Sequence, residues 1–381
     1  MHIGIDASRV TVAQRTGTEQ YTFELLAALA RIDRRNRYTL YCNQPPTALP
    51  PLGPNFSLRH IPFPRLWTHV RLSAELALHP PDVLFVPAHV LPVGVLLRRR
   101  MRTVVTIHDM GYLRFPESHT QSQRRYLRLS TNWSARCASR LIAISNITRD
   151  DLVRYAGASP DTISVVYHGV SPRFQPIEDQ NLIAATQAKY GITPPYFLYV
   201  GTIQPRKNLA RLLEAFASAG GGGWGIEVGM QPSSPQLVIA GKHGWLTNEI
   251  ARQSIQLFGP DSPAVRFTGY IADADLPALL SGALAFVFPS LYEGFGMPLL
   301  EAMACGTPVL ASSTSALPEI AGDAALLIDP EDTAAIADGM ARLASDAVLR
   351  ADLRARGLAR VAQFTWERCA EETLAVLLKA Y

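Results

Sequence analysis

Residues 289–312 read PSLYEGFGMPLLEAMACGTPVLAS and hold two glutamates, Glu293 and Glu301, on either side of a Gly-Phe-Gly turn. The apolar run before them, residues 283–288, predicts a buried strand. Pro298 is expected at the first position of a helix, where its missing N–H group leaves no hydrogen bond unmade. The segment therefore predicts a strand, a loop that carries Glu293, and a helix that carries Glu301 on its first turn.

This loop has the properties of a ligand site. Gly294 and Gly296 permit close approach of the backbone to a ligand, and the helix start offers unpaired N–H groups to an anionic or polyhydroxyl ligand. Carboxylates accept strong hydrogen bonds from sugar hydroxyls. The plainer alternative is a solvated Glu293 and a capping Glu301 without any ligand. The joint pattern favours the ligand site.

The composition narrows the class of protein. A chain of 381 residues is long enough for two domains, and a net charge of +4 is too small to indicate a nucleic-acid partner. The four cysteines stand far apart, so they form no zinc or redox motif and favour a reducing compartment. Residues 3–6 predict a strand rather than a signal peptide, and no apolar run is long enough to span a bilayer. We therefore expect a cytoplasmic protein, either soluble or peripheral to a membrane.

Short apolar runs alternate with helical patterns along the chain. Strands of a first domain are predicted at Ile3–Ile5, Tyr38–Tyr41, Val83–Val86, Val104–Ile107, Leu141–Ile144 and Ser164–Val166. Strands of a second are predicted at Phe197–Val200, Leu237–Ala240, Val265–Phe267, Ala285–Phe288, Val309–Ala311 and Leu326–Ile328. Helices are predicted between them, as at Thr18–Ile32, Gln123–Ser139, Leu209–Ala219 and Thr333–Ser345. Such alternation indicates the α/β class, with two doubly wound parallel-sheet domains.

A segment rich in proline, glutamine and polar residues, 171–195, marks the domain boundary. We expect an N-terminal domain over residues 1–175, a C-terminal domain over residues 190–362 and a terminal segment, residues 363–381, with a helix at about Glu367–Leu378. The glycine-rich residues 220–225 predict a flexible surface insertion.

The segment around Glu293 and Glu301 resembles the signature of the retaining glycosyltransferases of family 4, in which two glutamates are separated by seven residues. Other blocks resemble the same family in the same order: residues 104–109 (VVTIHD), 142–152 (IAISNITRDDL), 165–170 (VVYHGV), 197–209 (FLYVGTIQPRKNL) and 364–368 (FTWER). The resemblance implies the GT-B fold, in which two Rossmann-like domains face a cleft. It also implies that the N-terminal domain lies on the acceptor side, that the C-terminal domain binds the nucleotide sugar, and that the terminal helix crosses back to the N-terminal domain.

Arg206 and Lys207 follow a predicted strand end and precede a helix. A guanidinium fork beside an ammonium group suits a diphosphate, and in the family the matching residues bind the donor's diphosphate. The glycine directly after the strand is Gly201, and Thr202 stands where many relatives carry a further arginine. Arg206 is therefore expected to provide more of the positive charge that binds the diphosphate. The plainer alternative is a solvated basic turn.

Gly17 and Thr18 open the first long helix. A glycine at a helix start lets the backbone approach a phosphate, and in relatives the first-domain glycine loop closes over the donor phosphates. An ordinary helix cap by Thr16 or Thr18 is an equal alternative.

His108 ends a predicted strand, and the resemblance assigns it to the pocket of the transferred sugar, with Asp109 as an orienting residue or a cap. The resemblance also assigns Glu293 to the transferred sugar near its reacting carbon, Glu301 to the ribose hydroxyls, and residues 268–271 to the nucleobase. The complete expected donor-binding set is Gly17, Thr18, Gly201, Thr202, Arg206, Lys207, Tyr270, Ile271, Glu293, Gly294, Phe295, Gly296, Met297 and Glu301. The expected catalytic residues are Glu293, His108, Arg206 and Lys207.

The expected reaction is a transfer that retains the anomeric configuration, in which fixed charges stabilise an oxocarbenium-like centre. We expect no metal and no cofactor apart from the donor substrate. Residues 107–110, 115–117 and 201–208 are most similar to the mannosyltransferases of polysaccharide assembly. This similarity implies GDP-mannose as the first donor, a UDP-hexose as the second, and a glycan or lipid-linked glycan as the acceptor. The alternatives are a nucleotide-sugar epimerase with the GT-B fold and an inactive sugar-nucleotide-binding module.

A basic run, residues 98–102, follows an apolar stretch, and Arg124, Arg125 and Arg128 fall on the next long helix. Together they could contact anionic lipid at the inner face of a membrane. A solvated basic face is the plainer alternative.

Overall fold

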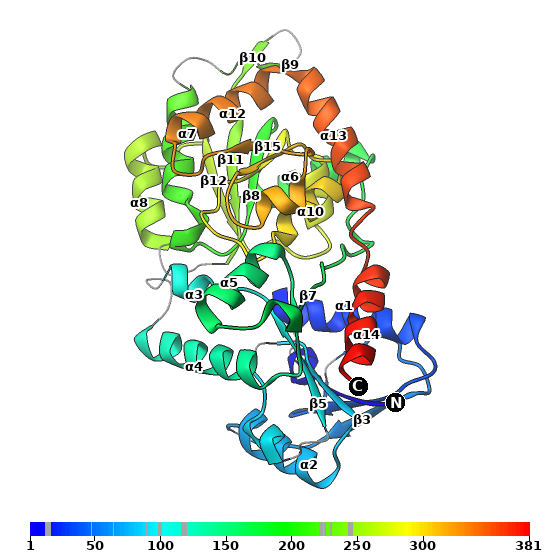
Figure 1. Ribbon diagram of the computed structural model, residues 1–381. Helices are drawn as coiled ribbons and strands as arrows, with labels where there is room; N and C mark the ends of the chain where they lie inside the picture. Colours follow the sequence, from blue (N-terminus) through cyan, green and yellow to red (C-terminus); the bar gives the residue numbers. More distant parts are fainter. Residues whose placement is uncertain are drawn as a thin grey trace. The chain divides into compact units, whose positions relative to one another are not determined.

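The computed structural model describes residues 1–11, 17–46, 48–63, 65–88, 90–97, 101–115, 120–220, 224, 226–228, 231–242 and 247–381. Thr16, residues 98–100 of the basic run, residues 116–117 and most of the glycine-rich segment lie outside this description. The chain divides into two compact units (Figure 1). Unit 1 comprises Met1–Gly169 with Phe364–Tyr381, and unit 2 comprises Val170–Gln363.

Unit 1 contains a seven-stranded parallel sheet in the order β3-β2-β1-β4-β5-β6-β7. The strands are β1 (His2–Asp6), β2 (Arg37–Cys42), β3 (Phe56–His60), β4 (Val83–Val86), β5 (Arg102–Ile107), β6 (Arg140–Ala143) and β7 (Ile163–Val165). The chain starts in the middle of the sheet, runs to one edge and then crosses to the other, which is the doubly wound arrangement. All six predicted strands of this half are present, with bounds within two residues of the prediction.

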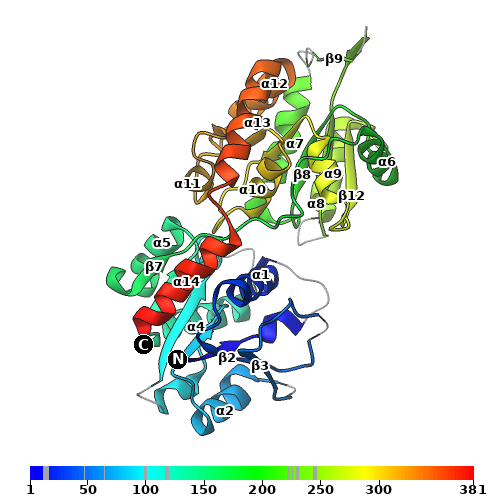
Figure 2. The ribbon, with the colours of Figure 1, turned by 90° about the vertical axis from the view of Figure 1, so that its right-hand side faces the viewer.

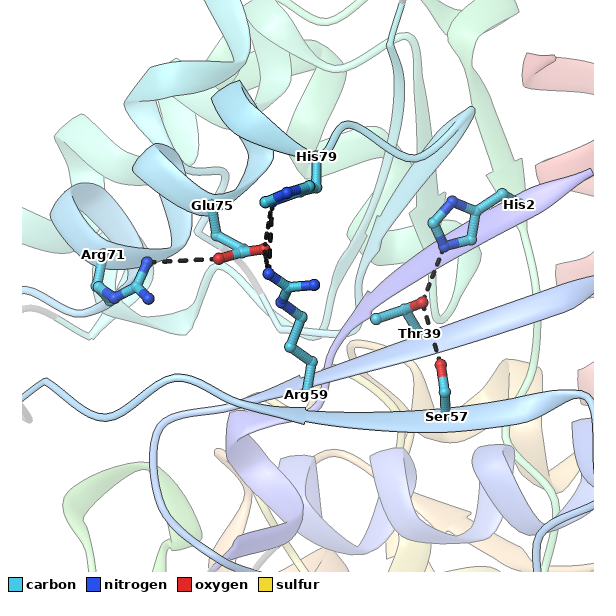
Figure 3. Close-up of polar contacts among 7 residues, drawn as sticks. All are labelled: His2, Thr39, Ser57, Arg59, Arg71, Glu75 and His79. Atoms are coloured by element: carbon cyan, nitrogen blue, oxygen red, sulfur yellow. Dashed lines mark hydrogen bonds and ion pairs between the residues drawn. The ribbon is translucent and has the colours of Figure 1, made fainter.

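The seventh strand, β3, was not predicted because it is short and has only two apolar residues, Phe56 and Leu58, and four of its five residues are exposed. An ion cluster ties this edge strand to α2 (Ser73–Leu78), as Figure 3 shows. Arg59 Nη2 of β3 lies 2.6 Å from the buried Glu75 carboxylate, which also contacts His79 at 3.0 Å and Arg71 at 3.5 Å. Side-chain hydrogen bonds also link the three neighbouring strands through His2, Thr39 and Ser57.

The helices of unit 1 pack on both faces of its sheet. Besides α2 they are η1 (Ser8–Thr11), α1 (Gly17–Ile32), the π-helical turn η2 (Thr68–Leu72), η3 (Val93–Leu97), α3 (Gly111–Arg114), α4 (Gln121–Cys137), α5 (Asn146–Ala156), η5 (Pro160–Thr162) and α14 (Trp366–Ala380). The C-terminal helix α14 packs beside α1 (Figure 1), and its Trp366, Ala370 and Leu377 share one core with Leu25 and Leu29 of α1. Among the described helices, none combines the length and the apolarity needed to cross a bilayer.

Unit 2 contains a six-stranded parallel sheet in the order β12-β11-β8-β13-β14-β15, and a small antiparallel pair, β9 with β10. The bounds are β8 (Tyr196–Val200), β9 (Ile226–Val228), β10 (Gln231–Ser233), β11 (Gln236–Ala240), β12 (Val265–Gly269), β13 (Ala285–Phe288), β14 (Val309–Ser312) and β15 (Leu326–Ile328). The six predicted strands of this half form the large sheet. The predicted class, two Rossmann-like parallel-sheet domains, is confirmed, whereas the cleft between them stays a prediction.

The helices of unit 2 form two layers, as expected for a parallel sheet covered on both faces. They are α6 (Gln180–Tyr190), η6 (Pro205–Lys207), α7 (Leu209–Gly220), α8 (Thr247–Phe258), α9 (Leu276–Ser281), α10 (Met297–Ala304), α11 (Leu317–Ala321), α12 (Thr333–Ser345) and α13 (Ala347–Val361). One layer contains α7, α8 and α12, and the other contains α6, α9, α10 and α13 (Figure 2).

Unit 2 begins at Val170, before the expected start at residue 190. The reason is that α6 packs on α9, and Lys189 Nζ and Tyr190 Oη each lie 2.6 Å from an oxygen of Asp275.

The two central strands of unit 2 position the site. β8 and β13 are neighbours, and their apolar sequences YFLYV and AFVF are almost wholly buried. Because the strands are parallel, the loops that follow Val200 and Phe288 leave the sheet at the same edge.

Candidate functional site

The loops after β8 and β13 are joined by hydrogen bonds. Asn208, which follows η6 and has a left-handed φ of +62°, donates through Nδ2 to Pro289 O at 3.1 Å and to Pro330 O at 2.6 Å. The Leu291 N–H donates to Arg206 O at 2.8 Å. These bonds fix η6, and therefore Arg206 and Lys207, against the loop that contains Glu293.

Glu293 forms ion pairs with both predicted cations. Arg206 Nη1 lies 2.9 Å from Glu293 Oε2 and donates at the same distance to Tyr292 O. Lys207 Nζ donates to the other carboxylate oxygen, Oε1, and lies 5.0 Å from the centre of the Phe288 ring. Lys207 and Glu293 are each 7% exposed. Two cations therefore share one buried carboxylate.

The charges decide the ionisation of Glu293. Burial acts to raise its pKa, but Lys207 and Arg206 outweigh burial and lower the pKa to about 2. The Glu293 N–H also donates to Ser315 Oγ at 3.1 Å, which holds the loop in place. Glu293 is thus a carboxylate at neutral pH, held by charge and by its backbone.

The helix after this loop starts as predicted but is displaced by one residue. Gly296 is the N-cap with φ +108°, a conformation that favours glycine, and a Cβ there would meet Leu317 Cδ2 at 2.6 Å. Pro298 is therefore the second helical residue and not the first. Glu301 is the fifth, so its expected place on the first turn was wrong.

Glu301 lies in surroundings unlike those of Glu293. Burial raises its pKa to about 7, Arg173 lowers it and Asp273 raises it further. Arg173 Nη1 lies 3.2 Å from Asp273 Oδ2, and the hydroxyl of Tyr270 donates to Asp273 Oδ1 at 2.9 Å. Arg173 and Asp273 thus influence the expected ribose residue, Glu301, through their charges, and Asp273 contacts the expected base segment through Tyr270. Sequence reasoning missed these two residues because neither belongs to a recognisable motif.

The remaining expected residues of unit 2 follow β8, β12 and β13. Gly201 and Thr202 follow β8, and Thr202 is exposed. Phe295 is 4% and Ile271 7% exposed, and Gly294 and Met297 lie in the Glu293 loop and at the start of α10. Tyr199, on β8, is buried next to Gly201, and its hydroxyl has no hydrogen-bond partner among the described residues.

His108 lies in unit 1, in a cluster of rings at the carboxyl ends of β5 and β7. Its Nε2–H donates to Pro87 O at 2.7 Å, and its ring centre lies 4.8 Å from that of Tyr21 and 5.6 Å from that of His168. Trp366 stacks on His168 at 5.9 Å. Burial, followed by the charge of His108, lowers the pKa of His168 well below its usual value. His168 was not singled out, although it lies in the recognised block 165–170.

The expected residues at the helix starts of unit 1 have less distinctive surroundings. Gly17 is the first residue of α1 and is exposed, and a Cβ added there would have no atom within 4 Å, so sterics do not require glycine at this position. The Thr18 carbonyl accepts from Thr22 Oγ1 at 2.9 Å. Asp109 Oδ1 accepts from the Gly111 N–H at 3.0 Å, but the N-cap of α3 is Met110, so the expected roles of Asp109 stay predictions.

Comparison with known proteins identifies the family. Residues 15–174 match the family described as Glycosyltransferase Family 4, and residues 184–360 match Glycosyl transferases group 1. The O-antigen chain mannosyltransferase B of Escherichia coli is 34% identical over 283 residues, which cover 74% of this chain and 72% of that protein. The chain belongs to glycosyltransferase family 4.

Other known proteins are similar to this chain in sequence or in fold. The serotype-specific mannosyltransferase WbdA of Escherichia coli is 30% identical over 234 residues, which span 61% of this glycosyltransferase but 28% of WbdA. Sucrose-phosphate synthase from Thermosynechococcus elongatus has a similar structure, with a TM-score of 0.77, 23% identity and coverage of 99% and 98% of the two chains. Anabaena HepE in complex with UDP and glucose gives a TM-score of 0.73 at 18% identity, with 99% of each chain covered. These two structures show the GT-B fold.

The geometry gives this glycosyltransferase two distinct chemical environments in unit 2. Arg206 and Lys207 form a cationic pair that is fixed at a sheet edge and suited to phosphate oxygens. Glu293 is an ionised carboxylate in contact with that pair, and Glu301 is a carboxyl group whose charge is disfavoured. The roles assigned to these residues, and to His108 in unit 1, stay predictions.

Proposed function

We propose that this family 4 enzyme transfers a hexose, in the first instance mannose from GDP-mannose, to a glycan or lipid-linked glycan acceptor with retention of configuration. The observation that carries the proposal is the triad of Arg206, Lys207 and Glu293 at the carboxyl ends of β8 and β13. Its cations suit the departing diphosphate and its carboxylate suits the transferred sugar. Mannose is preferred because the relatives at 34% and 30% identity are named mannosyltransferases.

Donor identity is tested by thermal shift with GDP-mannose, GDP, UDP-glucose and UDP. A ligand that binds only the folded state increases the free energy of unfolding by RT ln(1 + [L]/Kd), and so raises the melting temperature. We expect the guanine nucleotides to raise it and the uridine nucleotides to leave it nearly unchanged. The reverse order would replace GDP-mannose by a UDP-hexose.

Transfer is tested with radiolabelled GDP-mannose and lipid-linked glycans extracted from bacteria that assemble mannose polysaccharides. We expect label in the lipid-linked fraction, and an anomeric NMR signal that matches the donor's configuration. An isomerised nucleotide sugar formed without acceptor would instead indicate an epimerase, and binding without turnover on any acceptor would indicate an inactive module.

We also propose that unit 1 contacts the anionic inner face of the cytoplasmic membrane, where a lipid-linked acceptor would be presented. The support is the outer face of α4, where Arg124, Arg125 and Arg128 are exposed beside Tyr126 and Leu129, which are 51% and 71% exposed. Cations beside apolar side chains suit the headgroup region.

Sedimentation with vesicles tests the membrane contact. We expect binding to vesicles that contain phosphatidylglycerol, release by salt, and weak binding to phosphatidylcholine vesicles. Replacing Arg124, Arg125 and Arg128 by serine should abolish binding. The control replaces three exposed arginines of the same unit, Arg34, Arg35 and Arg37. Equal losses in both triple variants would show a net-charge effect and contradict a contact through α4.

A further inference from the structure

Glu293 and a bound diphosphate would compete for the same two cations. In this structure both Arg206 and Lys207 donate to the Glu293 carboxylate. A diphosphate bound to that pair carries more negative charge than one carboxylate and would draw the cations toward itself. Donor binding therefore leaves Glu293 in need of other hydrogen-bond donors, because an ionised carboxylate that is 7% exposed is unfavourable without them.

Two buried hydroxyl groups near Glu293 have unused hydrogen-bonding capacity. Tyr199 and Ser290 are fully buried, and neither hydroxyl has a hydrogen-bond partner within the described part of the chain. Buried hydroxyls are normally bonded, so a pair of unbonded ones beside a site needs an explanation.

Both hydroxyls lie within electrostatic reach of the triad. Ser290 is three residues before Glu293, and its hydroxyl adds to the lowering of the Glu293 pKa by the two cations. Tyr199 lies on β8, and its ring centre is 6.2 Å from that of Phe288, the ring over which Lys207 Nζ lies. Burial raises the pKa of Tyr199 and the charge of Glu293 raises it further, while Arg206 lowers it.

Gly201 preserves the space around the Tyr199 hydroxyl. A Cβ at position 201 would lie 2.7 Å from Tyr199 Oη, closer than side-chain atoms tolerate. A larger residue would therefore press on the hydroxyl end of the tyrosine side chain. The glycine after β8 thus leaves room for the hydroxyl of a buried tyrosine.

We propose that Tyr199 and Ser290 are positioning residues that receive the Glu293 carboxylate when the donor's diphosphate takes up Arg206 and Lys207. This inference rests on the proposed function, since it requires a diphosphate ligand. The two hydroxyls would keep Glu293 ionised and oriented after its cations have turned to the ligand. Because neither hydroxyl has a hydrogen-bond partner within the described part of the chain, their effect should appear mainly on ligand binding.

A double-mutant cycle tests this role, because it isolates the coupling between the hydroxyls and the carboxylate. Isothermal titration calorimetry measures the Kd of GDP-mannose, and separately of inorganic pyrophosphate, for the wild type, Tyr199→Phe/Ser290→Ala, Glu293→Gln and the triple variant. The matched control is Tyr196→Phe, on the same strand, whose hydroxyl donates to Leu279 O at 2.6 Å away from the triad.

Removing both hydroxyls should weaken ligand binding by about tenfold in the wild-type background, which equals two modest hydrogen bonds. In the Glu293→Gln background the same change should have an effect below about twofold, because a neutral amide needs less compensation. The melting temperature of Tyr199→Phe/Ser290→Ala should stay near the wild-type value, whereas Tyr196→Phe should lower it and leave Kd unchanged.

Equal effects in the two backgrounds, or no effect in the wild type, would overturn the inference. Pyrophosphate separates this failure from that of the proposed function, because it needs the two cations but no nucleoside or sugar. Coupling seen with pyrophosphate while GDP-mannose and UDP-glucose fail to bind would support the role of Tyr199 and Ser290 and contradict the nucleotide-sugar assignment. Binding of GDP-mannose without coupling would support the nucleotide-sugar assignment and contradict the role of the two hydroxyls.

Discussion

Arg206 and Glu293 are 87 residues apart in the chain, yet Arg206 Nη1 lies 2.9 Å from Glu293 Oε2, and Lys207 holds the other oxygen of the same carboxylate. The contact is possible because β8 and β13 are parallel neighbours whose loops leave the sheet at one edge. The triad of Arg206, Lys207 and Glu293 is therefore both a structural element and a candidate donor site. Its effect on stability and its effect on ligand binding can be measured separately.

Lys207→Ala should destabilise the protein, because it leaves the buried Glu293 with less compensation. We expect a loss of about 3 kcal/mol in the free energy of unfolding, measured by urea denaturation at pH 7. The control is Lys189→Ala, which breaks an exposed pair with Asp275 and should change stability little. Equal losses in both variants would contradict the buried character of the triad.

Glu293→Ala should lower turnover far more than donor affinity. The carboxylate is assigned to the reacting sugar and competes with the diphosphate, so its loss should reduce kcat by roughly 100-fold or more while Kd for the donor stays the same or falls. Steady-state transfer assays and calorimetry measure the two quantities. An unchanged rate would show that the assigned role is wrong.

The pH dependence of stability should differ between the two glutamates. The pKa of Glu293, about 2, lies below its ordinary value of 4.5, so its stabilising contribution is complete above pH 4.5 and is lost as the pH falls toward 2. Unfolding free energies from pH 6 to pH 2.5 should therefore decline more steeply for the wild type than for Glu293→Gln. Parallel declines would contradict the assignment.

Glu301 should behave in the opposite way. Its pKa is raised from 4.5 to about 7, so its ionisation weakens the fold progressively from pH 4.5 and fully above pH 7. Glu301→Gln should thus gain stability over the wild type at pH 8, by about 2 kcal/mol, and little at pH 4.5. A constant difference between the two proteins across this range would show that Glu301 titrates normally.

Trp366→Ala should destabilise unit 1 by about 3–5 kcal/mol, because a buried tryptophan is replaced by a cavity. Trp366 is 3% exposed and packs on Tyr21 and His168. Differential scanning calorimetry measures the effect, with Val348→Ala, at a position 81% exposed in unit 2, as the control. A small effect would mean that α14 is not anchored through this residue.

Much of the fold was predictable because the central strands are uniformly apolar. Ala285–Phe288 and Val83–Val86 have the predicted bounds, since apolar runs of this length are typical of buried strands. The edge strand Phe56–His60 is harder to recognise, because only Phe56 and Leu58 are apolar and four of its five residues are exposed. Its place depends on contacts distant in the chain, such as that of Arg59 with Glu75.

The site was predictable to the extent that motifs carry it. The blocks around Arg206 and Glu293 identified the residues of the triad but not their mutual ion pairs, which depend on strand order. Tyr199 was hidden inside an apolar run, where its ring reads as core. Asp273 has no motif, and its link to Tyr270 appears only once the loop after β12 is folded.

The central claim, that the triad binds a nucleotide sugar through its diphosphate, is tested most directly by calorimetric titration of GDP-mannose into the wild type and into Arg206→Ala and Lys207→Ala. The account predicts saturable binding to the wild type and an affinity loss of roughly 100-fold in each folded variant, because each removes a charged hydrogen-bond donor to phosphate. Wild-type affinity retained in both variants would contradict it.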